Sequence, residues 1–421
     1  MTAHQFSILF LFALVSSVLL QMWLAMRHIN HVRKHRKAVP AEFAEQITLD
    51  AHGKAAAYTV AKTRFGMFSN IFDAMVLVAF TVGGGIELLS QLTSPWFESE
   101  LAQGLALIGS LAVFSTLISL PFSLISTFVI EARFGFNQMS AKLFITDLIK
   151  STCIGAIIGL PLLAAILWLM GQMGEMWWLY VWATWLVFSL TLMWVFPTFI
   201  APLFNKFVPM EDGAMKERIV ALLARCGFKS NGLFVMDGSK RSSHGNAYFT
   251  GLGKSKRIVF FDTLLTHLEP AEVEAVLAHE LGHFKHRHIV KRLVWTFALM
   301  LGLLWLLGVL KTQPWFYQGL GVSTPSTAAA LLLFFMVLPV FTFILSPISS
   351  ITSRKHEYEA DAYAAKVCAQ SGGSSEDLVT ALVKLYRDNA STLTPDPLHS
   401  MFYDSHPPAS LRIAALRRLN A

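Results

Sequence analysis

Charged residues are scarce in this chain. Asp, Glu, Lys and Arg make up 14% of its 421 residues, whereas hydrophobic residues make up 54%. An average soluble domain carries about 25% charged residues, so this composition excludes an ordinary soluble protein. The apolar residues also form several runs of about 20, the length that spans the hydrocarbon core of a bilayer. The sequence therefore predicts a membrane protein.

Cysteine is nearly absent as well. The three cysteines, Cys153, Cys226 and Cys368, are widely spaced, and Cys153 lies inside an apolar run. This spacing fits neither a disulfide framework nor a cysteine metal cluster, so we expect buried or inert thiols. The net charge of +7 comes from Lys and Arg clustered beside apolar runs. That pattern is typical of membrane topology determinants, and we expect no nucleic-acid partner.

Seven apolar segments are long enough to cross a bilayer. They cover approximately residues 6–26, 68–90, 104–130, 147–170, 177–199, 292–310 and 327–349. Positive charges follow the first segment and do not precede it, which favours a retained anchor over a cleavable signal peptide. Nearly all Lys and Arg then fall in alternate connecting segments, namely 27–67, 131–146, 200–291 and 350–421. The positive-inside rule places these segments in the cytoplasm and the N-terminus outside.

The segment Leu277–His283 reads LAHELGH and contains the main chemical signal. Pro270, preceded by Glu269, marks a helix start, and we expect one helix to run from there into the span at 292–310. Spacing of i, i+4 puts His279 and His283 on one face, as in helices that hold zinc, with Glu280 placed to reach a metal-activated water. A chance HExxH in a His-rich membrane flank is the alternative. A third protein ligand decides between them.

Glu357 is the predicted third ligand. If the last two spans form an antiparallel pair, His283 precedes Lys311 by 28 residues and Glu357 follows Ser326 by 31. At about 1.5 Å per residue the two side chains lie within roughly one turn of the same depth. Asp361 shares a helix face with Glu357, and we expect it to orient a ligating imidazole.

The alternative for these carboxylates is an exposed helix end, with Arg354 and Lys355 as ion-pair partners. Glu359 points elsewhere on the helix and is not expected to bind the metal. Four further imidazoles are assigned to solvent or the membrane interface. They are His244, His267, His286 and His288.

Short strands are predicted in the polar segment before the zinc motif. They cover Leu233–Met236, Ala247–Thr250 and Arg257–Phe261, with glycines between them. An edge strand beside a zinc helix can hold an extended peptide by main-chain pairing, so Asn246, Ala247 and Tyr248 are predicted to bind substrate. A sheet that only packs the domain is the alternative. The basic glycine turn at 251–256 lacks full phosphate-loop spacing and gives little support for nucleotide binding.

With these residues in place, the chain resembles the CAAX prenyl protease type I family, which are integral-membrane zinc metallopeptidases with an HExxH…ExxxD site. The resemblance covers almost the whole chain. Its motifs here are the HELGH segment, EARFGFNQ at 131–138, PTFIAPLFNKF at 197–207, NAYF at 246–249 and SHPP at 405–408 followed by Arg412. The resemblance implies a ring of seven transmembrane helices around a chamber. It also implies roles for His406, as a donor to the oxyanion, and for Arg412, which would pin that segment.

The expected fold is an all-α membrane protein. Its seven transmembrane helices form a helical barrel around a chamber, with a small α+β zincin-like metallopeptidase domain on the cytoplasmic side. We divide the chain into residues 1–199 with the first five transmembrane helices, 200–291 with the HExxH helix, 292–349 with helices six and seven, and 350–421 with the ExxxD and HPP segments.

The predicted function is that of a membrane-embedded zinc endopeptidase. One Zn²⁺ per chain, held by His279, His283 and Glu357, lowers the pKa of a bound water toward about 7, and Glu280 is the general base. The resemblance implies removal of the C-terminal tripeptide from prenylated CAAX proteins. The expected partners are a peptide or protein substrate, with or without a lipid, and membrane lipid.

Other functions stay open on the sequence alone. They are a membrane quality-control zinc peptidase without prenyl specificity, a transporter, and a non-catalytic membrane scaffold. Few spans carry mid-membrane charges, which disfavours the transporter. Short outside loops favour a bacterial inner membrane over the endoplasmic reticulum, with the active site on the cytoplasmic side.

Overall fold

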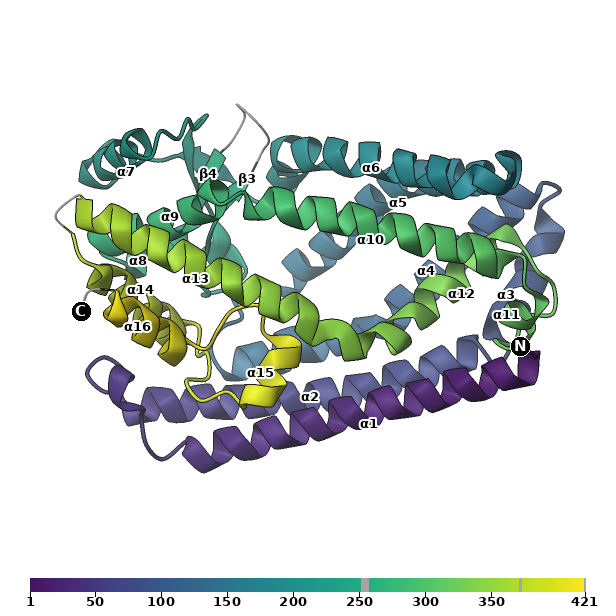
Figure 1. The fold of residues 1–421 in the computed structure, drawn as a ribbon, viewed down its shortest axis with the longest axis horizontal. Coiled ribbons are helices and arrows are strands. Elements are labelled where there is room, and N and C mark those ends of the chain that lie inside the picture. Colours follow the sequence, from purple (N-terminus) through teal and green to yellow (C-terminus); the bar gives the residue numbers. More distant parts are fainter. Residues whose placement is uncertain (251–256, 371–372, 420–421) are drawn as a thin grey trace.

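Long helices lie side by side along the molecule, and the polar elements gather at one end (Figure 1). The computed structural model describes residues 1–250, 257–370 and 373–419, so the glycine turn at 251–256 lies outside the described residues. Within these residues, seven helices are long and apolar enough to cross a membrane, which confirms the predicted multi-pass architecture.

Most of these helices are longer than the predicted spans, because helical structure continues beyond the hydrophobic runs, whereas α6 and α12 end before them. They are α1 (Ala3–His35), α2 (Leu49–Phe80), α4 (Glu100–Leu124, continued by a π-helix over Ile125–Glu131), α5 (Ala141–Gln172), α6 (Trp177–Val195), α10 (His288–Lys311), and α12 (Thr327–Thr342) followed by α13 (Ser346–Gln370). A 3₁₀ turn over Phe343–Leu345 separates α12 from α13 and lies between Pro339 and Pro347, residues that disfavour a regular helix.

The predicted second span, 68–90, was wrong at its C-terminal end. Helix α2 stops at Phe80, and a separate helix, α3 (Gly85–Thr93), follows a turn. Three consecutive glycines, Gly83 to Gly85, occupy this turn, and Gly84 has φ 78°. This left-handed conformation is open to glycine at little cost and ends the helix inside an apolar run.

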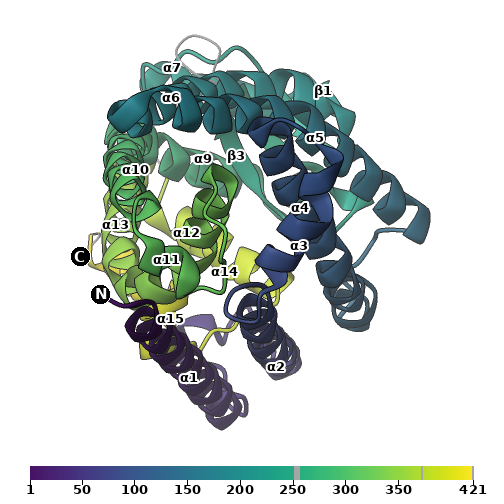
Figure 2. The same ribbon diagram turned by 90° about the vertical axis from the view of Figure 1, so that its right-hand side faces the viewer.

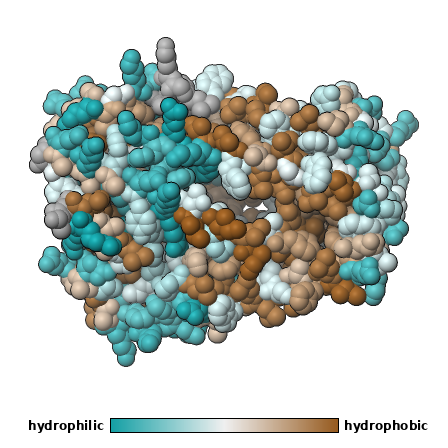
Figure 3. All heavy atoms as spheres, viewed as in Figure 1, coloured by the Kyte–Doolittle hydropathy of each residue, from teal (hydrophilic) through white to brown (hydrophobic). Residues whose placement is uncertain are grey.

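The membrane helices surround an interior space. Figure 2 shows α1, α2, α4, α5, α6, α10 and α12 around the long axis. Only 0% to 33% of the residues in their most apolar windows are buried, so apolar side chains line both the outside and the inside of the ring. Figure 3 shows a hollow in the middle of one face, rimmed mainly by hydrophobic side chains. The expected barrel around a chamber is therefore confirmed.

A buried hydrophobic cluster closes the ring at the end near the N-terminus. It joins α1, α3, α4, α5, α6, α10 and α12 with the short helix α11 (Pro314–Gln318). Its most deeply buried members include Phe10, Ile86, Leu107, Met170, Val181, Leu307, Phe316 and Leu333. Packing of this kind holds the helices together at one end and leaves the middle open.

The polar end contains a four-stranded mixed sheet in the order β1-β2-β4-β3. The strands are β1 (Phe207–Pro209), β2 (Leu233–Met236), β3 (Ala247–Thr250) and β4 (Arg257–Phe261). The predicted strands match β2, β3 and β4, whereas β1, only three residues long, was missed. Strand β3 lies at an edge, and no strand among the described residues pairs with its other side, where another extended chain could add.

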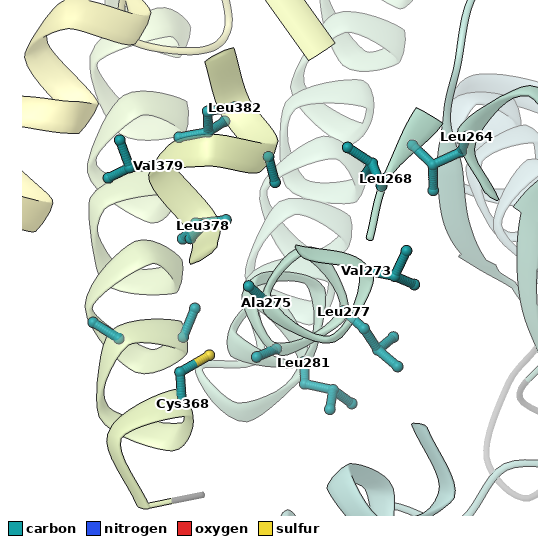
Figure 4. Close-up of a cluster of buried hydrophobic side chains, with 14 of the residues drawn as sticks. Leu264, Leu268, Val273, Ala275, Leu277, Leu281, Cys368, Leu378, Val379 and Leu382 are labelled. Carbon is teal, nitrogen blue, oxygen red and sulfur yellow. The ribbon is translucent and has the colours of Figure 1, made fainter. Parts of the chain in front are cut away.

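Six helices accompany the sheet and the C-terminal half of α13. They are α7 (Ala214–Arg225), α8 (Asp262–His267), α9 (Pro270–Lys285), α14 (Ser375–Asp388), α15 (Pro397–Tyr403) and α16 (Ala409–Arg418). Helix α9 lies between other elements of this domain, and Figure 4 shows Ala275 on the side of α13 and α14, with Val273 and Leu277 on the opposite side, near Leu264 and Leu268. Burial of Val273, Leu277 and Leu281 on α9 therefore fixes the helix that carries the HExxH motif.

One long helix through His283 into the next span was predicted, and this was wrong. Helix α9 ends at Lys285, and α10 begins at His288. Between them, Arg287 has φ 56°, a left-handed conformation that breaks the helical hydrogen bonding. The sequence gives no sign of the break, because glycine or asparagine usually occupies such a position.

Helices α9 and α13 approach closely at Gly282. A Cβ atom on this glycine would lie 2.8 Å from Cα of Ala360 and 3.0 Å from its carbonyl oxygen. Both atoms belong to the backbone of α13, so they cannot rotate away. The absence of a side chain at position 282 therefore lets the two helices carry their polar residues into one site.

Gly282→Ala is expected to force α9 and α13 apart. Overpacking of this kind costs about 1–3 kcal/mol of folding stability, and the displacement also weakens any metal bound between the helices. Gly302→Ala on α10 is the matched control, because no atom of the described residues would lie within 4 Å of a Cβ at that position. Thermal unfolding and zinc content, measured on both variants, check this. Equal behaviour of the two variants would contradict the close approach.

Candidate metal centre and active site

Helix α9 presents two imidazoles toward α13. It begins with Pro270 in the first turn, and the side chain and backbone of Glu269 form a reciprocal capping box with Glu272. One turn apart near the other end, His279 is buried and His283 is half-buried. Their Nε2 atoms face each other at 3.3 Å.

Glu357 of α13 completes a triangle of three ligand groups with the two imidazoles. Its Oε2 lies 3.4 Å from Nε2 of His279, and its Oε1 lies 3.4 Å from Nε2 of His283. Ligand atoms at about 2.0–2.1 Å from a tetrahedral zinc are separated by about 3.3–3.4 Å, and the N···N distance and the two N···O distances, one to each carboxylate oxygen, agree with this spacing. In addition, Glu357 Oε2 is buried without a hydrogen-bond partner in the described structure. The residues present therefore fit a zinc ion.

Asp361 and Arg412 support His279 from the side away from this triangle. Asp361 Oδ1 lies 2.8 Å from Nδ1 of His279, which fixes the ring with Nε2 toward Glu357. The guanidinium of Arg412 donates to both oxygens of Asp361, at 2.8 and 2.6 Å. Its Nη1 also lies 3.6 Å from Glu357. The structure therefore places all four side chains in one buried network.

Arg354 and Lys355, the alternative ion-pair partners for the carboxylates of the metal site, contact other groups. Arg354 donates to the carbonyl oxygen of Ser400, at 2.5 Å, and Lys355 lies 3.9 Å from Glu359. Glu359 turns away from the triangle, as expected from its place on the helix, and pairs with His288 at 2.8 Å.

The environment of His279 controls its protonation in the metal-free protein. Burial lowers the pKa of this imidazole, but the hydrogen bonds to Asp361 and Glu357 outweigh it and raise the pKa to about 8. The ring therefore carries a proton at neutral pH until a metal displaces it.

Zinc affinity is expected to rise with pH and to level off above about 8, because proton competition at His279 ends there. The pKa of His279 in the folded protein exceeds the ordinary value of 6.5, so the imidazole keeps the competing proton at pH values below about 8 and loses it at higher pH. Titration calorimetry in buffers of different ionisation enthalpy measures the protons released. We expect His279 to release about one proton per zinc at pH 7 and almost none at pH 9, in addition to the proton that a zinc-bound water with a pKa near 7 releases as the pH rises. Release at pH 7 no larger than that expected from the water alone would contradict the raised pKa.

A cavity of about 270 Å³ opens beside the three ligands. Its polar lining residues include Glu280, Asn246, His406 and Arg412, and Ala247 lies beside them. The remaining wall is largely apolar. Its apolar members are Leu264, Val276, Leu378, Leu382 and Leu385. The cavity therefore combines the candidate catalytic and metal-binding side chains with an aliphatic surface.

The three predicted substrate-binding residues are placed differently. Ala247 and Asn246 reach the cavity, and the Asn246 side chain accepts a hydrogen bond from the Ala247 backbone at 2.8 Å. Tyr248 is not among the lining residues, and its hydroxyl lies 4.0 Å from Sδ of Met236. Successive side chains of a strand point to opposite faces, so the Tyr248 side chain lies on the other face of β3.

His406 enters the site from the segment before α16. Its Nε2 lies 3.5 Å from Oε1 of Glu357, and its Nδ1 lies 2.9 Å from the hydroxyl of Ser405. Partial burial lowers the pKa of His406, although 60% of the side-chain surface is accessible to solvent. A neutral ring with its proton on Nε2 can donate a hydrogen bond into the cavity.

His288 was assigned to solvent or the membrane interface, and this was wrong. Its side chain is 4% exposed and lies against His283. His244 also has a partner within the domain, since its Nδ1 lies 3.2 Å from the amide oxygen of Asn389. His267 pairs with Asp388 at 2.8 Å, and His286 is exposed.

Comparisons with known proteins agree with this architecture. The family model for the CAAX prenyl protease N-terminal region, with five membrane helices, matches residues 28–206. The model for peptidase family M48 matches residues 209–420. CAAX prenyl protease 1 of Saccharomyces cerevisiae is 35% identical over 407 residues, covering 90% of this chain and 88% of the yeast protein.

Further relatives have similar coverage. The human CAAX prenyl protease 1 homolog is 32% identical over 445 residues, covering 95% of this chain and 92% of the human protein. The crystal structure of S. mikatae Ste24p superposes with a TM-score of 0.87 at 34% identity, covering 98% of both chains. The chain therefore belongs to peptidase family M48, as a multi-pass membrane metallopeptidase of the CAAX prenyl protease group.

Proposed function

We propose that this metallopeptidase uses one zinc ion, held by His279, His283 and Glu357, to cleave near the C-terminus of prenylated CAAX proteins. The observation that supports it most is the convergence of two imidazole nitrogens and one carboxylate, with N···N and N···O distances of 3.3 to 3.4 Å, beside a cavity that Glu280 lines. The substrate assignment draws on the relatives, whose names describe CAAX prenyl proteases.

The protein side chains divide the remaining chemistry. A zinc ion at this site supplies Lewis acidity, which makes a water molecule nucleophilic at neutral pH. Glu280 takes a proton from the attacking water and passes it to the leaving amine. His406 donates from Nε2 to the developing oxyanion. Asp361 and Arg412 hold His279 in place throughout.

The surroundings suit an extended peptide that ends in aliphatic residues. The free edge of β3 can pair with the peptide backbone, and Asn246 stands at its start. The aliphatic cavity wall formed by Leu378, Leu382 and Leu385 accepts an apolar side chain next to the scissile bond. The interior of the helix ring, rimmed by hydrophobic side chains, offers room for a lipid (Figure 3).

The active site is proposed to face the cytoplasm, because the positive-inside bias places the polar segments there. A bacterial inner membrane stays our prediction for the host membrane, on the basis of the short outside loops, with the endoplasmic reticulum as the alternative.

An assay on purified protein tests this function. A farnesylated CAAX peptide is compared with the same peptide without the lipid, before and after zinc is removed by a chelator and added back. We expect zinc-dependent cleavage of the farnesylated peptide and much slower cleavage of the plain one. Equal cleavage of both would support a quality-control peptidase without prenyl specificity. Zinc-independent cleavage would contradict the proposed mechanism.

A further inference from the structure

His288 lies directly against the metal-site residue His283. The Nδ1 atoms of the two rings are 3.0 Å apart, and Nε2 of His288 lies 2.8 Å from Oε2 of Glu359. The His288 ring is 4% exposed and stacks on His356 with a centroid distance of 3.9 Å. These contacts form a chain from Glu359 on α13, through α10, to the end of α9.

The break between α9 and α10 creates this chain. In an uninterrupted helix, a residue five positions after His283 would point about 140° away from it. The left-handed backbone of Arg287 ends α9 and makes His288 the first residue of α10. Its ring then lies against His283.

Hydrogen-bond accounting gives each ring a definite tautomer. Nε2 of His283 faces His279 and Glu357, so its lone pair points into the proposed zinc site and its proton is on Nδ1. That N–H donates to Nδ1 of His288. His288 then carries its own proton on Nε2, which donates to Glu359. Every polar atom of both rings is used once.

We infer that His288 and Glu359 are positioning residues for His283, as Asp361 is for His279. This rests on the proposed zinc site. The two ligands are supported unequally: His279 contacts a carboxylate directly, whereas His283 reaches Glu359 only through a neutral imidazole.

The same geometry disfavours a second metal ion on His286, His288 and Glu359, whose ligand atoms also lie within 4.8 Å of one another. A metal on Nε2 of His288 would displace its proton. The proton of His288 would then move to its Nδ1 and donate to Nδ1 of His283. His283, with zinc on Nε2 and no proton on Nδ1, would no longer be a neutral imidazole. A zinc ligand is normally a neutral imidazole whose other nitrogen donates a hydrogen bond.

The test measures zinc affinity of the metal-free full-length protein by competition with a chromophoric chelator. Three variants are compared: His288→Asn, His288→Leu and His286→Leu. Asparagine and leucine have nearly the same shape, but only asparagine keeps an acceptor near the position of the imidazole Nδ1. His286 is exposed, with its ring centroid 5.5 Å from that of His288, and serves as the matched control.

We expect His288→Leu to lose about 10- to 100-fold in zinc affinity, His288→Asn to recover most of this loss, and His286→Leu to match the wild type. Thermal unfolding of the metal-free proteins separates an effect on metal positioning from an effect on folding. His288→Asn and His288→Leu both lose the imidazole ring, so we expect similar unfolding temperatures but different zinc affinities. Equal affinity of the Asn and Leu variants overturns the inference. So does a second zinc per chain that disappears in His286→Leu. A wild-type protein that binds no zinc refutes the proposed metal site itself.

Discussion

Replacing Glu280 with glutamine is expected to lower the rate of peptide cleavage by about 10²- to 10⁴-fold, the usual contribution of a general base. Glutamine has the same shape as glutamate but cannot accept the proton from the attacking water. Zinc content should stay at about one ion per chain, because the three ligands are unchanged. Cleavage of a farnesylated CAAX peptide, measured together with metal analysis, checks both expectations.

Glu376→Gln is the control for this substitution. Glu376 is exposed and pairs with Arg417 at 3.2 Å, remote in sequence from the HExxH motif and absent from the cavity wall, so its loss should leave cleavage unchanged. Cleavage by Glu280→Gln at a rate within about threefold of the wild type, too small for a lost general base, would remove Glu280 from the mechanism.

Arg412→Leu is expected to be the most destabilising of these substitutions. Arg412 is 6% exposed and donates to Asp361, which is 2% exposed, through two hydrogen bonds. Removing one partner of a buried pair leaves an uncompensated charge and costs about 3–5 kcal/mol. Here the carboxylates of Asp361 and Glu357 both lose this cation. A lower thermal midpoint and lower zinc affinity should appear together.

The double variant Arg412→Leu with Asp361→Asn separates charge from packing. Removing the stranded carboxylate should restore part of the stability that Arg412→Leu loses, because the buried negative charge is gone. If the double variant were as unstable as the sum of the single variants, the ion pair would not explain the effect.

The membrane architecture could be predicted from the sequence because hydropathy depends on residue type alone. Runs of apolar residues located all seven spans. Their ends were less predictable: the glycines at 83–85 stop α2 within an apolar run, and polar residues continue α1 to His35. Hydropathy reports where a helix leaves the bilayer, and hydrogen bonding decides where it ends.

Much of the candidate site also followed from regular geometry. The i, i+4 spacing placed His279 beside His283, and counting residues from the outer loop placed Glu357 at their depth. The position of His288 could not be predicted from the sequence. Arg287 adopts a left-handed conformation, and arginine, unlike glycine or asparagine, does not indicate one. The aliphatic wall of the cavity could not be predicted from the sequence either. Leu378, Leu382 and Leu385 reach the cavity only because α14 packs against it in the tertiary structure.

The central claim is that residues of α9 and α13 together bind one metal ion. Zinc content and X-ray absorption of the wild type and Glu357→Gln test it most directly. We predict about one zinc per wild-type chain, bound by two imidazoles and a carboxylate, and little bound zinc in Glu357→Gln. Full zinc content in that variant, or a wild-type spectrum with three imidazole ligands, would contradict the site described here.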